Sequence, residues 1–392
     1  MTSYREAVGE SLRELDLAIN AIWRLGQNMV VGWSHEGSNV LLCVVPTLLV
    51  FEAAATVPQV FQGQRHMPSI PFQNLCKDLQ ARPNRVSLPL QVGDGREELS
   101  PAIIDNLIRR YSVTRTPHRA VMLFDIVGFS LASSIEQVAQ LNSLEYSING
   151  ATKRLRQVGT ELELARSTVG DGFYVWNRST GLQADIATYI ALILILADNA
   201  RARREVQSGF VPLLRACFTI GPHYSYHQVE GTSPRGFEYI VGEVTITLAR
   251  LISKALTNQM IVGAFRRPLD NVPGRELDTP MFMTQAAAAM AKLSGLEMGD
   301  YPLTELRSYL TGAELKDGRY GVEGFKIKDK HGLLHECFNA NVVLVDEAGT
   351  RTELGMKRGE LDQFEAERFR YDLTAEQMVK MFAQMRETAP AG

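Results

Sequence analysis

The stretch AVMLFDIVGFS, residues 120–130, decides the fold. Its first seven residues are a nearly continuous apolar run with the length of one strand, which predicts a strand buried in a sheet. Asp125 stands close to the end of that run, and Gly128 permits a close approach of the backbone. Ser133 and Glu136 have the spacing of a capping box, which predicts a helix from there to about residue 157.

A second acidic residue stands at the tip of a tight turn. The sequence Gly170-Asp171-Gly172 joins two expected strands, 162–168 and 173–177, and this composition is typical of a β-hairpin. Taken singly, each Asp is better explained as an ordinary strand end or turn, and it is the combination with the flanking residues that favours a site. Neighbouring antiparallel strands would bring Asp125 and Asp171 together, and two such carboxylates repel each other unless a cation lies between them. Hard oxygen ligands suit Mg²⁺ or Mn²⁺.

The segment after the first strand has the features of an anion site. Gly128, Phe129 and Ser130 lie between the strand and the expected helix. Free backbone amides and the positive end of a helix dipole favour phosphate groups at such a place. We therefore expect this segment to face a triphosphate.

The order of the remaining elements predicts the fold class. The further elements expected are helices at 184–206 and 243–257, strands at 214–221, 237–241 and 260–264, and a hairpin near 325–345. This order predicts an α+β sandwich in which helices cover a mixed sheet. We expect this domain to span 118–345, with an N-terminal region of unknown role at 1–115 and a helical C-terminal tail at 346–392.

The flanking regions give further expectations. An amphipathic helix is expected at 3–25, and Thr116-Pro117-His118 is expected to be a boundary. The apolar run 40–57 contains Pro46 and Glu52, which favour two strands, or a strand and a helix, over a membrane span. The tail is expected to hold helices near 360–370 and 375–386, the second capped by Thr374 with Leu373 packed on Met378.

Composition excludes several classes of protein. Of the 392 residues, 45% are hydrophobic and 22% charged, as in a globular protein with a full core. The 41 basic and 44 acidic residues give a net charge of −3, which offers no electrostatic reason to expect a nucleic-acid partner. Four scattered cysteines predict reduced, mostly buried thiols in a cytoplasmic protein. No signal peptide is recognisable, and the apolar run 186–197 is too short for a membrane span and suits a core helix.

Three motifs in this order resemble the catalytic domain of class III nucleotidyl cyclases. They are FDIVGFS at 124–130, VGDGF at 169–173 and VGEV followed by ARL within 241–251. The resemblance covers roughly residues 118–340. It implies a ferredoxin-like, palm-type sandwich that converts a nucleoside triphosphate to a cyclic monophosphate and pyrophosphate.

The resemblance also implies roles for particular residues. Asp125 and Asp171, with the Ile126 carbonyl, would bind two ions of Mg²⁺ or Mn²⁺. Arg250 matches the arginine that stabilises the transition state, and Lys330 matches a lysine that grips the phosphates. A solvated hairpin lysine is the alternative for Lys330.

Four positions bear on the substrate. Ser167 stands where purine cyclases carry a Lys or Glu, and by the two-residue period it shares a strand face with Asp171. Tyr239 replaces an acidic or small polar residue, and its volume favours a smaller base. Ile246 replaces an Asn that orients the ribose, a role that Thr247 would take in a shifted register.

These departures resemble the pyrimidine cyclases of bacterial antiphage defence, with UTP favoured over CTP as substrate. The family arrangement implies a homodimer in which Asp125 and Asp171 of one subunit meet Arg250 and Lys330 of the other. A downstream effector that binds the cyclic nucleotide is expected by analogy. The alternatives are an adenylate or guanylate cyclase and a catalytically inactive nucleotide sensor on the same fold. The histidine pairs 223/227 and 331/335 are interpreted as surface or hydrogen-bonding groups rather than metal ligands.

Overall fold

A computed structural model describes nine stretches of the chain: 4–24, 26–53, 56–61, 63–206, 209–228, 237–270, 272–299, 301–312 and 321–371. The chain divides into two compact units. The first consists of Met1–Thr116 and Tyr224–Ile240, and the second of Pro117–His223 and Val241–Gly392. As a division into functional domains, the boundaries expected from the sequence stay a prediction.

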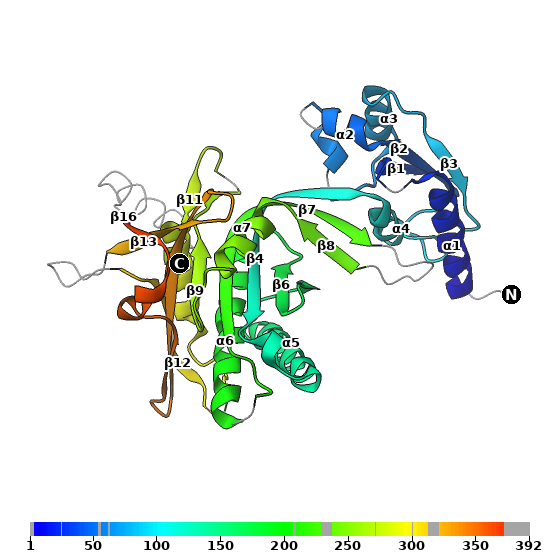
Figure 1. The fold of residues 1–392 in the computed structure, drawn as a ribbon. Helices are drawn as coiled ribbons and strands as arrows, with labels where there is room; N and C mark the ends of the chain where they lie inside the picture. Colours follow the sequence, from blue (N-terminus) through cyan, green and yellow to red (C-terminus); the bar gives the residue numbers. More distant parts are fainter. Residues whose placement is uncertain are drawn as a thin grey trace. The chain divides into compact units, whose positions relative to one another are not determined.

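The first unit is built on a three-stranded antiparallel sheet in the order β1-β2-β3 (Figure 1). The strands are β1 (Asn28–Glu36), β2 (Asn39–Pro46) and β3 (Asn84–Ser87). The helices are α1 (Tyr4–Ile22), α2 (Thr47–Ala53), α3 (Ser69–Asp78) and α4 (Pro101–Ile108), with short 3-10 helices η1 (Pro58–Phe61) and η2 (Arg109–Tyr111). The expected first helix is confirmed, and residues 40–53 of the apolar run form the strand β2 and the helix α2.

Alternate residues of β1 and β2 face two separate hydrophobic cores. Val30 and Trp33 pack with α1 and α4, whereas Val31 and Cys43 pack with α2 and α3. A register shift between Val30 and Gly32 marks a bulge in β1. The sheet is therefore covered by helices on both faces, which explains why its strands read as continuous apolar runs.

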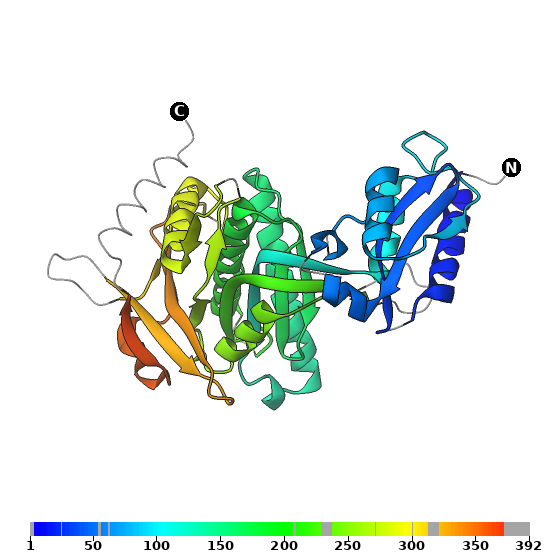
Figure 2. The same cartoon turned by 90° about the horizontal axis from the view of Figure 1, so that it is seen from above.

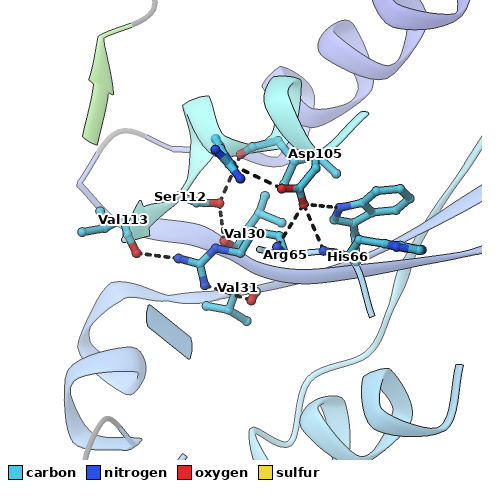
Figure 3. A network of polar contacts seen from close by, with 10 residues as sticks. Val30, Val31, Arg65, His66, Asp105, Ser112 and Val113 are labelled. Atoms are coloured by element: carbon cyan, nitrogen blue, oxygen red, sulfur yellow. Dashed lines mark hydrogen bonds and ion pairs between the residues drawn. The ribbon is translucent and has the colours of Figure 1, made fainter. Parts of the chain in front are cut away.

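A buried polar network joins the elements of this unit (Figure 3). Oδ1 of Asp105 accepts hydrogen bonds from Trp33 Nε1 at 3.0 Å and from the backbone N–H groups of Arg65 and His66 at 2.9 and 3.0 Å. The buried Arg65 guanidinium donates to three backbone carbonyls, those of Val31, Val60 and Val113, at 3.2, 2.6 and 2.6 Å. This network satisfies groups that burial would otherwise leave unpaired.

The second unit is built on an eleven-stranded mixed sheet, parts of whose strands β4, β7 and β8 belong to the first unit. Its order is β16-β13-β14-β9-β7-β4-β6-β5, with β12 and β15 also paired to β14 and β8 to β7. The strands are β4 (Val113–Ile126), β5 (Leu164–Thr168), β6 (Gly172–Asn177), β7 (Leu214–Gln228), β8 (Phe237–Val241), β9 (Met260–Gly263), β12 (Leu303–Leu310), β13 (Val322–Lys328), β14 (Leu334–Asp346), β15 (Arg351–Gly355) and β16 (Glu367–Tyr371). β7 and β9 run parallel, whereas β4 and β6, β5 and β6, and β9 and β14 run antiparallel.

Helices pack on this sheet and complete the unit (Figures 1 and 2). They are α5 (Ser134–Gln157), α6 (Leu182–Glu205), α7 (Glu243–Ile252) and α8 (Thr279–Met290), with 3-10 helices η3 (Phe129–Leu131), η4 (Ala291–Leu293) and η5 (Arg358–Gln363) and a small hairpin of β10 (Arg266–Pro268) and β11 (Glu276–Asp278). One core cluster contains residues of α5, α6, α8 and the sheet. The expected α+β class, with helices on a mixed sheet, is confirmed.

Helix α6 is the one helix of the described residues that is long and apolar enough to cross a membrane, but 78% of its apolar window is buried in the structure. That agrees with the core helix expected there. All four cysteines are free and buried, as expected.

Several boundaries differ from the sequence-based expectations. β4 begins at Val113 and runs through Pro117, so the chain continues as one strand across the boundary expected at 116–118. The division between the two compact units nevertheless falls there, between Thr116 and Pro117. The fixed φ of proline lies in the extended range, and proline interrupts a strand only where its N–H is needed. The helix expected near 360–370 is wrong, because η5 and β16 occupy that region. Phe369 and Tyr371 alternate with charged residues, which is the period of a strand. The predicted helix 375–386, with Leu373, Thr374 and Met378, lies outside the described residues.

Candidate active site

Strand pairing brings the two predicted acidic residues together. β4 and β6 pair so that Asp125 lies opposite Gly172, and the Ile126 N–H donates to the Asp171 carbonyl at 2.8 Å. A Cβ atom on Gly172 would lie 1.9 Å from the Phe124 carbonyl oxygen, so only glycine permits this close approach. The backbone of Asp171 is therefore fixed beside the end of β4.

The electrostatics of Asp125 reflect this crowding. The residue is 8% exposed, and burial raises the pKa of its carboxyl. The Arg215 guanidinium opposes that rise: its Nε donates to Asp125 Oδ2 at 2.6 Å. Asp171 raises the pKa of Asp125 further, through its charge and through a side-chain hydrogen bond. Asp125 thus lies between a guanidinium that stabilises its charge and a carboxylate that opposes it.

This donor set fits a hard divalent cation. Among the described residues, no group of three or more His, Cys, Asp or Glu side chains could hold a metal ion. The pair of carboxylates would therefore leave coordination positions for water, a backbone carbonyl and substrate phosphates. Mg²⁺ is commonly bound in this way, through one or two carboxylates and the phosphates of a substrate. The observed charge imbalance around Asp125 is the feature that a cation would relieve.

The segment that precedes α5 forms a 3-10 turn rather than the first turn of the α-helix. Gly128 has a φ of 73°, and η3 follows it before Ser133 caps α5 with Glu136. The first N–H groups of such a turn have no acceptor within it. Gly128 and Ser130 are exposed, and Phe129 is half-buried. The predicted role of Gly128, Phe129 and Ser130 towards a triphosphate stays a prediction.

The predicted cations Arg250 and Lys330 belong to a second cluster. Arg250 lies in the last turn of α7, and its Nε is 3.4 Å from Asp329 Oδ2. Asp329 directly follows β13, and the exposed Lys330 follows it in the turn to β14. The structure thus brings the two predicted basic residues to the same hairpin turn.

Asp329 is a residue that the sequence reasoning missed. Burial acts to raise the pKa of its carboxyl, but hydrogen bonds from the backbone N–H groups of Leu333 and His331, the His335 side chain and the charge of Arg250 lower that pKa to about 2. A carboxylate fixed in this way forms an ion pair with the Arg250 guanidinium. The sequence Asp329-Lys-His-Gly332 is a turn pattern in which the Asp side chain caps the turn, and this signal could have identified it.

The residues predicted to contact the base and ribose lie on β5, β8 and α7. Ser167 lies on β5, which ends at Thr168, and Gly170 follows with a φ of 89°. The two-residue period expected from Ser167 to Asp171 is therefore wrong, because the turn begins between them. Tyr239 belongs to the first unit and stacks on Tyr226, with ring centroids 5.4 Å apart. Their roles stay predictions.

Helix α7 presents the two residues considered for the ribose contact. Ile246 is 56% exposed on its surface. Thr247 lines a cavity of about 400 Å³ together with His118, Glu243, Phe265 and Tyr371. Thr245 is committed to the start of the helix, because its hydroxyl accepts from the Gly242 N–H at 3.2 Å. A polar group is therefore available at residue 247 and absent at residue 246.

The histidines set aside as metal ligands have other partners. His223 is buried, and its Nε2 lies 3.2 Å from a guanidinium nitrogen of Arg119. Burial and the charge of Arg119 lower the pKa of His223 to about 4. His335 lies 3.3 Å from Asp329. Both act as hydrogen-bonding groups in the described part of the chain.

No family model matches the chain, and no curated protein matches it. Among solved structures, the chain is similar to the guanylate cyclase domain of RhGC from Catenaria anguillulae in complex with GTP, at 14% identity and a TM-score of 0.34, over 58% of this chain and 97% of that one. It is also similar to the adenylyl cyclase CyaB from P. aeruginosa, at 15% identity and a TM-score of 0.28, over 43% of this chain and 93% of that one. At TM-scores this low, the function has to be argued from the residues of this chain.

Proposed function

We propose that the chain is a metal-dependent nucleotidyl cyclase that converts a pyrimidine nucleoside triphosphate, UTP in preference to CTP, to its 3′,5′-cyclic monophosphate and pyrophosphate. The observation that carries the proposal is the contact between Asp125 and Asp171 at the paired ends of β4 and β6, next to the exposed Gly128 turn. The product would act as a cytoplasmic second messenger in antiviral defence, read by an effector that binds the cyclic nucleotide.

The proposed reaction requires no covalent intermediate with the protein. The ribose 3′-oxygen attacks the α-phosphorus, the bond to the pyrophosphate oxygen breaks in line, and the 3′-hydroxyl proton leaves to solvent. Two divalent cations, when bound by Asp125, Asp171 and the Ile126 carbonyl, would lower the pKa of the 3′-hydroxyl and neutralise phosphate charge. The amides of the Gly128 turn would orient the phosphates.

Arg250 and Lys330 supply the remaining positive charge. Arg250, held by Asp329, would stabilise the charge that develops on the α-phosphate oxygens, and the exposed Lys330 would bind the leaving pyrophosphate. The contacts of Arg250 run to the hairpin turn, and those of Asp125 run to Arg215 and Asp171. As in the family arrangement that the sequence resembles, we propose that the two clusters meet in one site across a homodimer, each subunit supplying one cluster to each of two sites.

An exposed apolar stripe supports association of two copies. It follows η3 and α5 of the second unit and consists of four residues with exposed fractions from 54% to 91%, Leu131, Ile135, Val138 and Tyr146. Ile135 and Val138 are three positions apart and share a face of α5, and Leu131 lies in η3 just before that helix. Exposed apolar residues that gather on one surface are a feature of interaction sites.

The substrate assay tests the chemistry directly. The purified chain with Mn²⁺ and each of the four labelled triphosphates should release pyrophosphate and form cyclic UMP, with cyclic CMP as the lesser product. Predominant cyclic AMP or cyclic GMP would replace the pyrimidine proposal with a purine cyclase. Nucleotide binding without pyrophosphate release, unchanged by Asp125→Ala, would favour the inactive sensor.

Mixing two inactive variants tests the shared site. Asp171→Ala and Arg250→Ala proteins should each be inactive, and a mixture should recover part of the activity, because one site of the heterodimer keeps all its groups. A mixture as inactive as its components would contradict the composite site.

A further inference from the structure

Arg215 is held by contacts at both ends of its guanidinium. It is the second residue of β7, the strand next to β4 in the sheet. Its Nε donates to Asp125 Oδ2 at 2.6 Å, and one terminal nitrogen donates to the Ala255 carbonyl at 3.0 Å. The side chain is 28% exposed, so solvent screens its charge only in part. These contacts fix the guanidinium against one member of the carboxylate pair.

In this position the charge of Arg215 opposes the binding of a cation by the carboxylate pair. The contact occupies one oxygen of Asp125, and when both carboxylates are ionised it offsets one of the two negative charges of the Asp125–Asp171 pair. A divalent cation bound between the carboxylates would lie within a few ångströms of a guanidinium that the Ala255 carbonyl keeps from swinging away. Like charges at that range repel each other. A nucleoside triphosphate brings several negative charges and would offset the repulsion.

We propose that Arg215 is an internal counter-cation that weakens the binding of free divalent cations to the Asp125–Asp171 pair, so that the site fills only together with the triphosphate. The proposal rests on the proposed function, because it takes the pair as the cation site. It assigns Arg215 a positioning role through Asp125 and no contact with the substrate.

Mn²⁺ binding measured by calorimetry without nucleotide tests this role. Because the positive charge is removed, Arg215→Met should bind Mn²⁺ about ten-fold more tightly than the wild type. This change corresponds to about 1.4 kcal/mol of binding free energy. Arg215→Lys keeps the charge and should bind as the wild type does. Arg215→Gln, which retains a donor for Ala255, should behave as Arg215→Met does and serves if the methionine variant fails to fold.

The outcomes separate the two proposals. Equal or weaker Mn²⁺ binding by the neutral variants, in proteins whose thermal unfolding matches the wild type, would overturn the role of Arg215 and leave the cyclase proposal standing. Adding Asp125→Asn to Arg215→Met should remove the gained affinity, and its persistence would place the bound ion elsewhere and overturn the role. If neither wild type nor variants bind Mn²⁺ with or without a non-hydrolysable UTP analogue, both proposals fail.

Discussion

Asp105 and Asp125 are both buried carboxylates next to an arginine, but their surroundings differ. In the first unit, Asp105 accepts three hydrogen bonds at Oδ1 and one from Arg109 Nε at Oδ2. In the second unit, Asp125 accepts one hydrogen bond from Arg215 and faces the like charge of Asp171. An ionised carboxylate has room for about four donors. Asp105 is therefore satisfied by the protein, whereas Asp125 keeps unused acceptor capacity beside a second carboxylate.

The comparison distinguishes a carboxylate that stabilises the fold from a carboxylate that can bind a cation or a proton. A fully satisfied carboxylate stabilises the fold and has little left to offer a ligand. A crowded pair destabilises the fold locally and is kept where a cation or a proton is used. Loss of Asp105 should therefore appear in stability, and loss of Asp125 in activity.

The largest expected effect is on catalysis by Asp125→Asn. Because metal-assisted charge stabilisation is worth several kcal/mol, the cyclisation rate should fall about 10³-fold. The free energy of unfolding should stay equal or rise, since one of two repelling charges is removed. Steady-state assays of cyclic nucleotide and urea unfolding measure the two effects, and a destabilised variant with near-normal turnover would reverse the comparison.

Asp105→Ala should act in the opposite way. Removing it leaves the Trp33 Nε1 and the backbone N–H of Arg65 without acceptors in a buried region. Breaking a buried charged network in this manner costs about 3–5 kcal/mol. Urea unfolding followed by tryptophan fluorescence should show the loss, with Mn²⁺ binding unchanged; a stability change under about 1 kcal/mol would mean that the network is dispensable.

Gly172→Ala tests whether the close approach of β4 and β6 sets the distance between the two carboxylates. The new Cβ would force β4 and β6 apart at Phe124, at an expected cost of about 1–3 kcal/mol, and would separate the carboxylates. Mn²⁺ affinity should fall along with stability. Gly9→Ala in α1 is the matched control, because no atom lies within 4 Å of its new Cβ and alanine favours a helix. Normal Mn²⁺ binding by the Gly172 variant would show that the approach of the strands does not set the site.

The smallest expected effect belongs to Asp329→Asn. Asparagine still accepts from the His331 and Leu333 N–H groups but loses the charge that holds Arg250. The turnover number should fall about ten-fold, or about 1.4 kcal/mol, with Mn²⁺ affinity unchanged. Asp346→Asn, at another hairpin turn where the side chain accepts from Thr350 N–H, is the control and should leave turnover unaffected. A fall in Mn²⁺ affinity in the Asp329 variant would mean that its role is not limited to Arg250.

The pKa of Asp329 adds a pH test. Its pKa in the folded protein, about 2, lies below the ordinary 3.8. A depressed pKa contributes stability above the unfolded value, and that contribution is lost as the pH falls from about 4 to about 2. Acid unfolding of Asp329→Asn should therefore depend less on pH in this window than unfolding of the wild type.

The carboxylate pair could be predicted from the sequence because its signals are local. An apolar run marks β4, and two glycines around Asp171 mark the hairpin that meets it. Arg215 could not be predicted, because no local sequence pattern around an arginine near the start of a strand indicates that its partner is Asp125, 90 residues away. The Arg65–Asp105 network was missed for the same reason, since the donors to Asp105 come from β1, the segment at 65–66 and η2. β16 was missed because its short alternating pattern was read as part of a helical tail.

The most direct measurement is anomalous diffraction at the manganese edge from crystals of the protein grown with Mn²⁺ and a non-hydrolysable UTP analogue. The account predicts manganese peaks at about 2.0–2.3 Å from carboxylate oxygens of both Asp125 and Asp171, with the phosphates completing the shell. Peaks bound to only one of the two carboxylates, or to other residues altogether, would contradict it.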